Sequence, residues 1–447
     1  MVSSETRQQP KATAVQLAFL IYGACCAGAF GLEEMVSASG PGIALATLVI
    51  LPFLWSVPVA LACAELTAAF PLEGGNYRWS RLSLGEFWGF QAGWWNWMTN
   101  FATNGAFAVL FVGYLQHWLP PLSFWERWGI AVALIWGLTA VNFFGIRVVG
   151  NAAIVMSVLL LLPFVALVVI GFLRSAHVPF EPFLAPGKTW LSAFGASAML
   201  AIWLYSGFDK LSAAAGEVEN PQRSFPFALF FAVSLTVVSY VLPTAAGLAA
   251  LGNWAEWKEG YFSTMAAALG GPVLGTAMTA AALISNALLL NVSLLSSSRV
   301  PYAMAEDRML PAGLARVHPR FGTPRTALVV QACVLSLLAL QNFQQLIVVY
   351  AWLRMADYML IFLNLWRLRR TRPDAARPFR VPGGKAGLAL TVFPPMGLAL
   401  AVVVGTVWTG TGIDVTKTMV GAVALASGPL AYGIFGRQRE QAAEKGL

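Results

Sequence analysis

The feature that most constrains this chain is its series of long apolar segments. A helix needs about 20 apolar residues to cross the hydrocarbon core of a bilayer. Twelve segments reach this length, and only 11% of the 447 residues are charged, against about 25% in soluble domains. The sequence therefore predicts an all-α membrane protein with twelve transmembrane helices. The predicted spans are 13–37, 42–70, 86–116, 126–147, 150–174, 190–217, 225–251, 272–305, 324–342, 344–369, 387–409 and 413–435.

Two of these spans, the first and the sixth, are interrupted near their middle. The first loosens at Gly28 and Gly31 and then carries Glu33 and Glu34, and the sixth contains the stretch 204–209, with a glycine followed by an acid. A charge near mid-membrane costs about 2.5–3.5 kcal/mol on insertion scales, so such acids predict function. Paired discontinuous helices are typical of transporters that bind substrate between two repeats.

The positions of the interrupted spans predict the domain organisation. If residues 13–174 (spans 1–5) and 190–369 (spans 6–10) are equivalent halves, spans 1 and 6 correspond to each other. Five spans per half force opposite orientations, so we expect a 5+5 inverted repeat with discontinuous helices 1 and 6. Two peripheral helices follow in 387–435, and residues 1–12 and 436–447 form the predicted cytoplasmic tails.

The distribution of positive charge predicts the orientation in the membrane. The net charge of +8 is unevenly distributed, because most of the 28 Lys and Arg residues fall in loops on the side of the N-terminus. The positive-inside rule then places both termini in the cytoplasm. We expect a multi-pass plasma-membrane protein that binds no nucleic acid.

The acids beside the interruptions favour a cationic substrate. The second half of a broken helix exposes backbone N–H groups, which attract anions. Glu33 and Glu34 already supply that negative charge and would repel a substrate carboxylate, so their field favours an ammonium group, with Asp209 able to hold a second one. The alternative is that one glutamate pairs with Lys210 or lies in an outer vestibule.

Polar residues in spans 3 and 8 extend the predicted site. Asn100, Thr103 and Asn104 share one helical face, where they serve either as interhelical hydrogen-bonding groups or as part of a substrate site. Aromatic residues next to the second break, Phe208 first and then Trp203 and Tyr205, are candidate lids. The predicted substrate-binding residues are Gly28, Ala29, Phe30, Gly31, Glu33, Glu34, Asn100, Thr103, Asn104, Ser206, Gly207, Phe208, Asp209, Ser285 and Asn286.

Three acids of the predicted spans are candidates for proton coupling, which needs a carboxyl whose pKa changes between buried and exposed states. They are Glu33, Asp209 and Glu65, although Glu65 also suits a cytoplasmic gate or a structural role. In span 10, the spacing of Arg354 and Asp357 favours a structural ion pair. We expect no metal and no cofactor, since the four cysteines lie in apolar runs and a proton gradient supplies the driving force.

At several of these residues the chain resembles the amino acid–polyamine–organocation (APC) superfamily, and within it the plant-type polyamine uptake and L-type amino acid transporter branch. This resemblance implies a fold of twelve spans that carries amines or amino acids, usually with protons. The matching stretches are GAFGLEE (28–34), PFLWSVP (52–58), AEL (64–66) with FP (70–71), FWGFQ (87–91), DK (209–210) with AGEVE (215–219), FGTP (321–324) and RPFRVP (377–382).

The chain departs from this branch in spans 3 and 8. The branch is thought to hold ammonium groups with acids of spans 1, 3, 6 and 8, whereas here Ala92, Thr103, Asn291 and Ser293 stand where acids are common. The prediction is therefore an amine or polyamine importer, with an amino acid permease or exchanger of the same fold as the alternative. A sensor or channel without transport is a distant third, because we find no ring of pore charges. We expect no enzyme and no protein partner.

Overall fold

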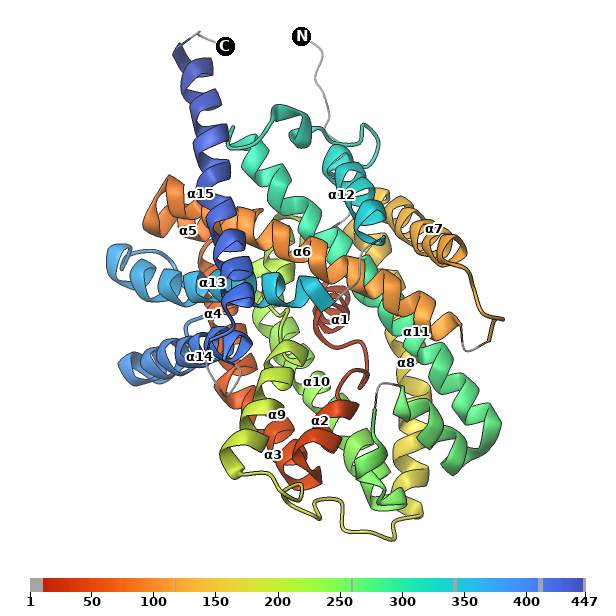
Figure 1. Ribbon diagram of the computed structural model, residues 1–447. Helices are drawn as coiled ribbons and strands as arrows, with labels where there is room; N and C mark the ends of the chain where they lie inside the picture. Colours follow the sequence, from red (N-terminus) through yellow and green to blue (C-terminus); the bar gives the residue numbers. More distant parts are fainter. Residues whose placement is uncertain (1–10, 117, 259, 341–343, 409–412, 445–447) are drawn as a thin grey trace.

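The fold is helical throughout the part of the chain that the structure describes. This computed structural model describes residues 11–116, 118–258, 260–340, 344–408 and 413–444, so residues 1–10 and 445–447 of the predicted tails lie outside it. Seven described helices are long and apolar enough to cross a membrane, and three shorter apolar helices accompany them. The prediction of an all-α multi-pass membrane protein is confirmed (Figure 1).

The helices of the first half follow the predicted spans with two differences. The second span bends at Trp55, because the ring of Pro58 clashes with the carbonyl of Leu54, four residues earlier. A short helix after this span was not predicted. The elements are α1 (Ala14–Cys25), α2 (Glu33–Ser39), α3 (Pro41–Leu54), α4 (Ser56–Ala69), α5 (Asn76–Leu84), α6 (Glu86–Leu115), α7 (Phe124–Phe143) and α8 (Ile146–Leu173).

The second half contains the longest helix, which begins earlier than predicted. The predicted start at 272 coincides with a turn at Gly271 (φ 77°), and a short helical stretch precedes that turn. The elements are α9 (Trp190–Leu204), η1 (Lys210–Glu217), α10 (Pro221–Leu251), η2 (Trp254–Glu256), α11 (Tyr261–Glu306), η3 (Ala312–Ala315), α12 (Arg325–Leu338), α13 (Gln344–Thr371), α14 (Gly384–Val407) and α15 (Val415–Glu444).

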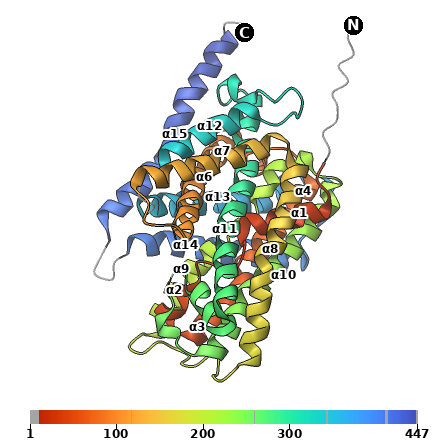
Figure 2. The ribbon, with the colours of Figure 1, turned by 90° about the vertical axis from the view of Figure 1, so that its right-hand side faces the viewer.

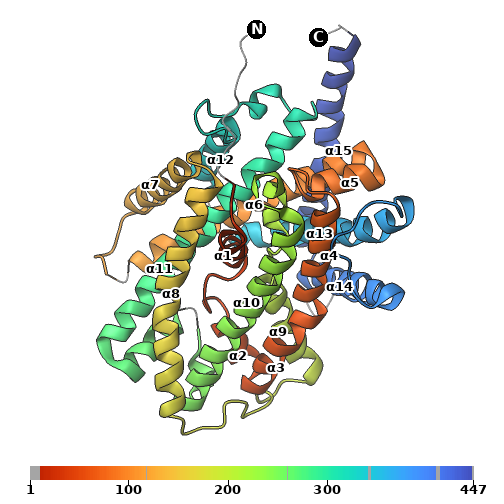
Figure 3. The same ribbon diagram turned by 180° about the vertical axis from the view of Figure 1, so that it is seen from behind.

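Helix α1 lies in the centre of the molecule. It packs against α8, α10 and α11 (Figures 2 and 3). Its residues from Gln16 to Cys25 are almost all buried. A capping box between Thr13 and Gln16 begins the helix. Just before it, Ala12 forms a short β-bridge with Val218. The start of the first span is thereby attached to the end of the sixth, and both interruptions lie inside the helical bundle.

Candidate functional site

The first interruption occupies residues 26–32, between α1 and α2. Ala27, Gly28 and Gly31 have φ of 45°, 99° and 89°, values that a right-handed helix does not allow. Glu33 then begins α2, and its Oε2 accepts a hydrogen bond from the N–H of Gly31 at 2.8 Å. The carboxylate of Glu33 thus supplies negative charge to a backbone donor that the break exposes.

The second interruption occupies residues 205–209, between α9 and η1. Gly207 has a φ of 121°, and its N–H donates to the hydroxyl of Tyr358 on α13 at 2.8 Å. The chain beyond is a 3₁₀ helix rather than the continuous helix predicted to 217. Ser212 donates its hydroxyl to the carbonyl of Asp209, and such local bonds compete with regular helix geometry.

The two interruptions lie against each other in antiparallel fashion. A Cβ on Gly207 would lie 2.8 Å from the carbonyl oxygen of Ala24, at the end of α1. A Cβ on Gly31 would lie 3.5 Å from the ring of Trp203, at the end of α9. Asp209, which follows Gly207, therefore lies toward the α1 side of the break, whereas Glu33 lies toward α2.

Replacing Gly207 by Ala is expected to destabilise this junction. A methyl group at this φ is strained by about 1–3 kcal/mol and would also press on the carbonyl of Ala24. We expect a lower thermal unfolding midpoint in detergent. The matched control is Gly129→Ala in the second turn of α7, where nothing lies within 4 Å of the added methyl and the helix gains stability. Equal midpoints for the two variants would contradict the close approach at Gly207.

Aromatic and aliphatic side chains surround the first break. Phe30 packs edge-on against Phe164, Phe262 and Tyr114, with ring centroids 5.1–6.4 Å apart. Ala29 is fully buried, as is Phe208, whose ring belongs to the main core. Of the predicted lid residues, Trp203 is therefore the one that lies against Gly31.

The two adjacent glutamates have different environments. Glu33 is 1% exposed at the start of α2, whereas Glu34 is exposed. Burial makes the charge of Glu33 far more sensitive to a neighbouring cation, since water screens it less. Glu34 therefore differs from Glu33 in lying outside the protein interior.

Asp209 forms a buried ion pair with Arg354 of α13. The guanidinium of Arg354 also donates to Asp357 at 3.1 Å and to the hydroxyl of Tyr358 at 2.8 Å. All four side chains are at least 97% buried. The predicted pair of Arg354 with Asp357 is confirmed, and the same arginine also holds the acid of the second break.

A chain of hydrogen bonds continues from this ion pair to α6 and α11. Asp357 accepts from Asn96 at 2.9 Å, Asn96 accepts from Asn100 at 3.1 Å, and Asn100 accepts from Ser293 at 3.2 Å. Sequence reasoning missed Asn96, although it lies four residues before Asn100 on the predicted polar face. We refer to Asp209, Arg354, Asp357, Asn96 and Asn100 as the Asp209 network.

The remaining polar residues of the predicted stripe differ in their bonding. Thr103 donates to the carbonyl of Thr99 on its own helix at 3.0 Å. Asn104 is fully buried, and neither polar atom of its amide has a hydrogen-bond partner among the described residues. An unsatisfied buried amide costs about 1–3 kcal/mol, so Asn104 is suited to contact a ligand or a bound water.

The predicted residues of span 8 are buried in α11. Asn286 donates to the carbonyl of Ala282 on the same helix at 2.9 Å, and Ser285 is 2% exposed. Ser206, in the second break, likewise donates within its own segment, to the carbonyl of Ile202. Within the described ranges, no hydrogen bond joins Ser285 or Asn286 to either interruption.

Glu65 lies in an ion-pair cluster away from both breaks. Its carboxylate pairs with Arg369, at the end of α13, and with Arg377 at 3.4 Å in the following loop. It also accepts the N–H of Val381 at 2.7 Å. Glu65 therefore joins α4 to α13 and to the start of the α14 segment.

A further charged cluster connects the loop after α4 to η1 and α11. Arg299 of α11 forms a two-fold hydrogen-bonded ion pair with Glu217 of η1, at 2.7 and 3.0 Å. Glu73 packs beside it against Gly216, and burial and the neighbouring charge of Glu217 raise the pKa of Glu73 to about 7. Sequence reasoning missed this cluster because its members are far apart along the chain.

The raised pKa of Glu73 predicts a pH-dependent stability. The carboxyl of Glu73 binds its proton more tightly in the folded chain than in the unfolded chain. Its contribution to the free energy of unfolding is therefore full at acidic pH and is lost as pH rises from about 4.5 to about 7. We expect Glu73→Gln to unfold at a higher temperature than wild type at pH 8 and at a similar temperature at pH 5. Identical differences at both pH values would rule out titration of Glu73 in this window.

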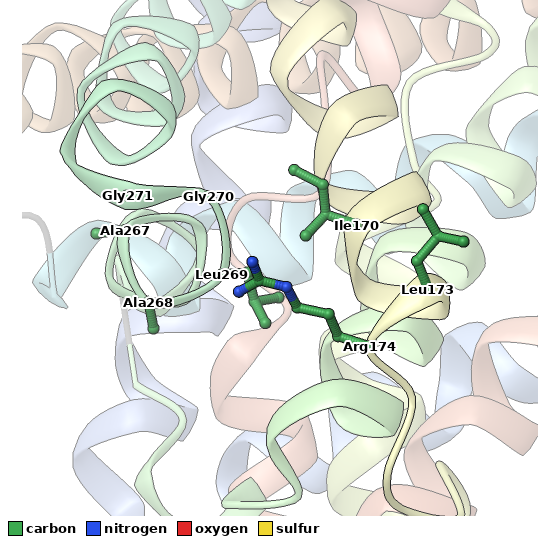
Figure 4. A pocket seen from close by; sticks show the side chains of 8 residues that line it. All are labelled: Ile170, Leu173, Arg174, Ala267, Ala268, Leu269, Gly270 and Gly271. Carbon is green, nitrogen blue, oxygen red and sulfur yellow. The ribbon is translucent and has the colours of Figure 1, made fainter.

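A surface cavity of about 470 Å³ lies elsewhere, between the end of α8 and the first part of α11. Ile170, Leu173 and Arg174 line one side and residues 267–271 the other (Figure 4). None of these residues is in the predicted site. The cavity does not reach the interruptions through its lining residues, so we assign the site to the breaks.

Comparison with known proteins agrees with this architecture. The sequence profile of the family described as amino acid permease matches residues 13–428. The chain is 36% identical to polyamine transporter PUT1 of Oryza sativa subsp. japonica over 92% of its length and 76% of the relative's. It is 33% identical to polyamine transporter RMV1 of Arabidopsis thaliana, over 94% and 84%. A probable polyamine transporter of the same plant is 35% identical, over 90% and 84%.

These matches cover nearly all the described helices, including both interruptions. The long apolar helices fit a protein that is embedded in a membrane, and the family description fits one that acts on a small molecule. The chain therefore belongs to the amino acid permease family, and it is a multi-pass membrane transporter rather than an enzyme.

Proposed function

We propose that this protein is a secondary active transporter that imports small organic amines or polyamines by proton symport and alternating access. The observation that carries the proposal is the carboxylate of Glu33, buried at the start of α2 beside the first break. Such an anion favours an ammonium group and disfavours a substrate carboxylate. The three plant relatives, all named as polyamine transporters or probable ones, support the same substrate class.

The substrate-binding region in this proposal lies between the two breaks. Glu33 binds an ammonium group, the amide of Asn104 supplies hydrogen bonds, and Trp203 covers the break at Gly31. The other predicted residues shape the region by their packing. Glu34, being exposed, contributes only to the attraction of cations from the water.

The proposed architecture is twelve spans in a 5+5 inverted repeat, with residues 13–174 and 190–369 as the halves and 387–435 as two peripheral helices. The interruption between α1 and α2 and the one between α9 and η1 occupy corresponding places in these halves, which supports the repeat. Both termini are cytoplasmic in this proposal, and the membrane is the plasma membrane.

In this proposal a second group carries the proton, because the carboxylate of Glu33 cannot hold a proton and an ammonium group together. Asp209 and Glu65 are the candidates. Each is paired with an arginine of α13, Asp209 with Arg354 and Glu65 with Arg369. Protonation of either acid would weaken its ion pair, so we propose that proton binding releases α13 and thereby couples to conformational change.

Uptake into proteoliposomes tests this function. We expect saturable uptake of labelled putrescine that increases when the outside is acidic and falls when a protonophore collapses the gradient. Uptake that ignores the gradient would contradict proton symport but not amine transport. Absence of putrescine uptake with active uptake of a neutral amino acid would contradict the amine assignment.

An amino acid permease or exchanger is the second candidate. The polar positions of span 8 carry neutral residues that bond within the protein, Asn291 with Asn142 and Ser293 with Asn100. These positions therefore add no negative charge for a second or third ammonium group. Competition of neutral amino acids with labelled putrescine would favour this candidate, whereas an amine importer should not respond to them.

A further inference from the structure

We infer that Arg354 determines how many ammonium groups the site holds, because its guanidinium occupies the place on Asp209 that a second ammonium group would take. This inference rests on the proposed function and adds a specificity-determining residue to it. A monoamine needs only the anion at the first break. A diamine gains from Asp209 only by displacing a guanidinium that belongs to the protein.

The geometry fixes Arg354 on Asp209. The arginine is 1% exposed, its guanidinium lies 4.3 Å from the ring centre of Tyr358, and it bonds the hydroxyl of that tyrosine. The same hydroxyl accepts the N–H of Gly207. Arg354 is therefore attached to the backbone of the break as well as to the carboxylate of Asp209.

The charge balance of the Asp209 network explains why Arg354 affects the number of substrate ammonium groups that the site binds. Arg354 lies between two buried acids, Asp209 and Asp357, so the three groups together carry one negative charge. Asp357 has further partners, because it accepts hydrogen bonds from Asn76 and Asn96. Asp209 forms its ion pair with Arg354. The ammonium group of Lys210 lies within electrostatic range of both Asp209 and Arg354.

The test compares putrescine with butylamine, which has the same carbon chain and one ammonium group fewer. The double variant Arg354→Met with Asp357→Asn keeps one negative charge in the network and removes the guanidinium from Asp209, while Lys210 stays unchanged in every variant. We expect its preference for putrescine over butylamine, measured as a ratio of dissociation constants, to rise about tenfold or more over wild type, as for a charge-assisted hydrogen bond. Binding is measured by calorimetry on the purified full chain.

Two controls separate this effect from a purely structural role. Arg354→Met with Asp209→Asn also keeps one negative charge but removes the proposed ammonium acceptor, so its preference should stay at the wild-type value. Arg354→Lys retains the cation and should also stay near wild type. A structural role for Arg354 would lower the unfolding temperature of these variants without changing the ratio between the two amines.

The outcomes distinguish the inference from the proposed function. If wild type binds both amines and the ratio does not rise when Asp209 is freed, the role assigned to Arg354 is wrong and amine transport stands. If wild type binds neither amine, the proposed function itself fails. A rise in the ratio that also occurs in the Asp209→Asn double variant would assign the second ammonium group to another acid and overturn the inference.

Discussion

Replacing Glu33 by Gln is expected to reduce amine uptake by about 10- to 100-fold. A hydrogen bond to a charged group contributes about 1.5–3 kcal/mol, which corresponds to this range of affinity. The change preserves the size of the side chain and removes its charge beside the first break, where Glu33 accepts the N–H of Gly31. Initial rates of putrescine uptake into proteoliposomes, corrected for the amount of protein, measure the effect.

The matched control is Glu34→Gln. This neighbour belongs to the same first turn of α2 but is exposed, so its charge is screened by water and counter-ions. We expect its uptake to stay within about threefold of wild type, as for a surface charge worth less than 1 kcal/mol. Equal losses in the two variants would mean that the overall acidity of α2, rather than the buried position of Glu33, attracts the substrate.

Of all the proposed substitutions, Glu65→Ala is expected to lower the stability of the folded protein most. The change leaves Arg369 and Arg377, which are 8% and 9% exposed, without their shared carboxylate, and it removes the acceptor for the N–H of Val381. Breaking a buried ion pair by removing one partner costs about 3–5 kcal/mol. The midpoint of thermal unfolding in detergent should fall clearly below that of wild type.

An exposed ion pair provides the comparison for Glu65. Asp414 pairs with Lys417 at 3.5 Å, and the lysine side chain is 48% exposed. Asp414→Asn should leave the midpoint of thermal unfolding close to that of wild type, as is usual for surface pairs. If Glu65→Ala unfolds at the same temperature as Asp414→Asn, the cluster around Glu65 does not hold α4 to α13.

The helical, membrane-embedded fold and both interruptions could be predicted from the sequence, because they depend on local features. Apolar length determines which segments suit a bilayer, and the glycines at 28, 31 and 207 adopt the positive φ values at which the helices stop. The bend at Trp55 and the helical stretch that precedes the turn at Gly271 were missed, although the predicted start at 272 coincides with that turn. Hydrophobicity continues across Trp55, so apolar length alone does not reveal the bend.

The partners of the buried charges could not be predicted, because they lie far apart along the chain. Asp209 was expected to hold an ammonium group or a proton, and Glu65 to hold a proton or to serve as a gate or in a structural role. Both are paired with arginines of α13. Arg354 has an acid three residues away, and this local pair concealed its bond to Asp209. Only the packing of α13 against the second break brings these groups together.

The most direct test of amine recognition is a thermal-shift comparison on the purified full chain. Ligands that bind the folded state but not the unfolded state raise the unfolding temperature, and the shift grows with the ratio of ligand concentration to Kd. The account predicts that putrescine and butylamine raise this temperature in wild type and no longer do so in Glu33→Gln, whereas neutral amino acids of similar size leave wild type unchanged. Stabilisation by neutral amino acids without stabilisation by either amine would contradict it.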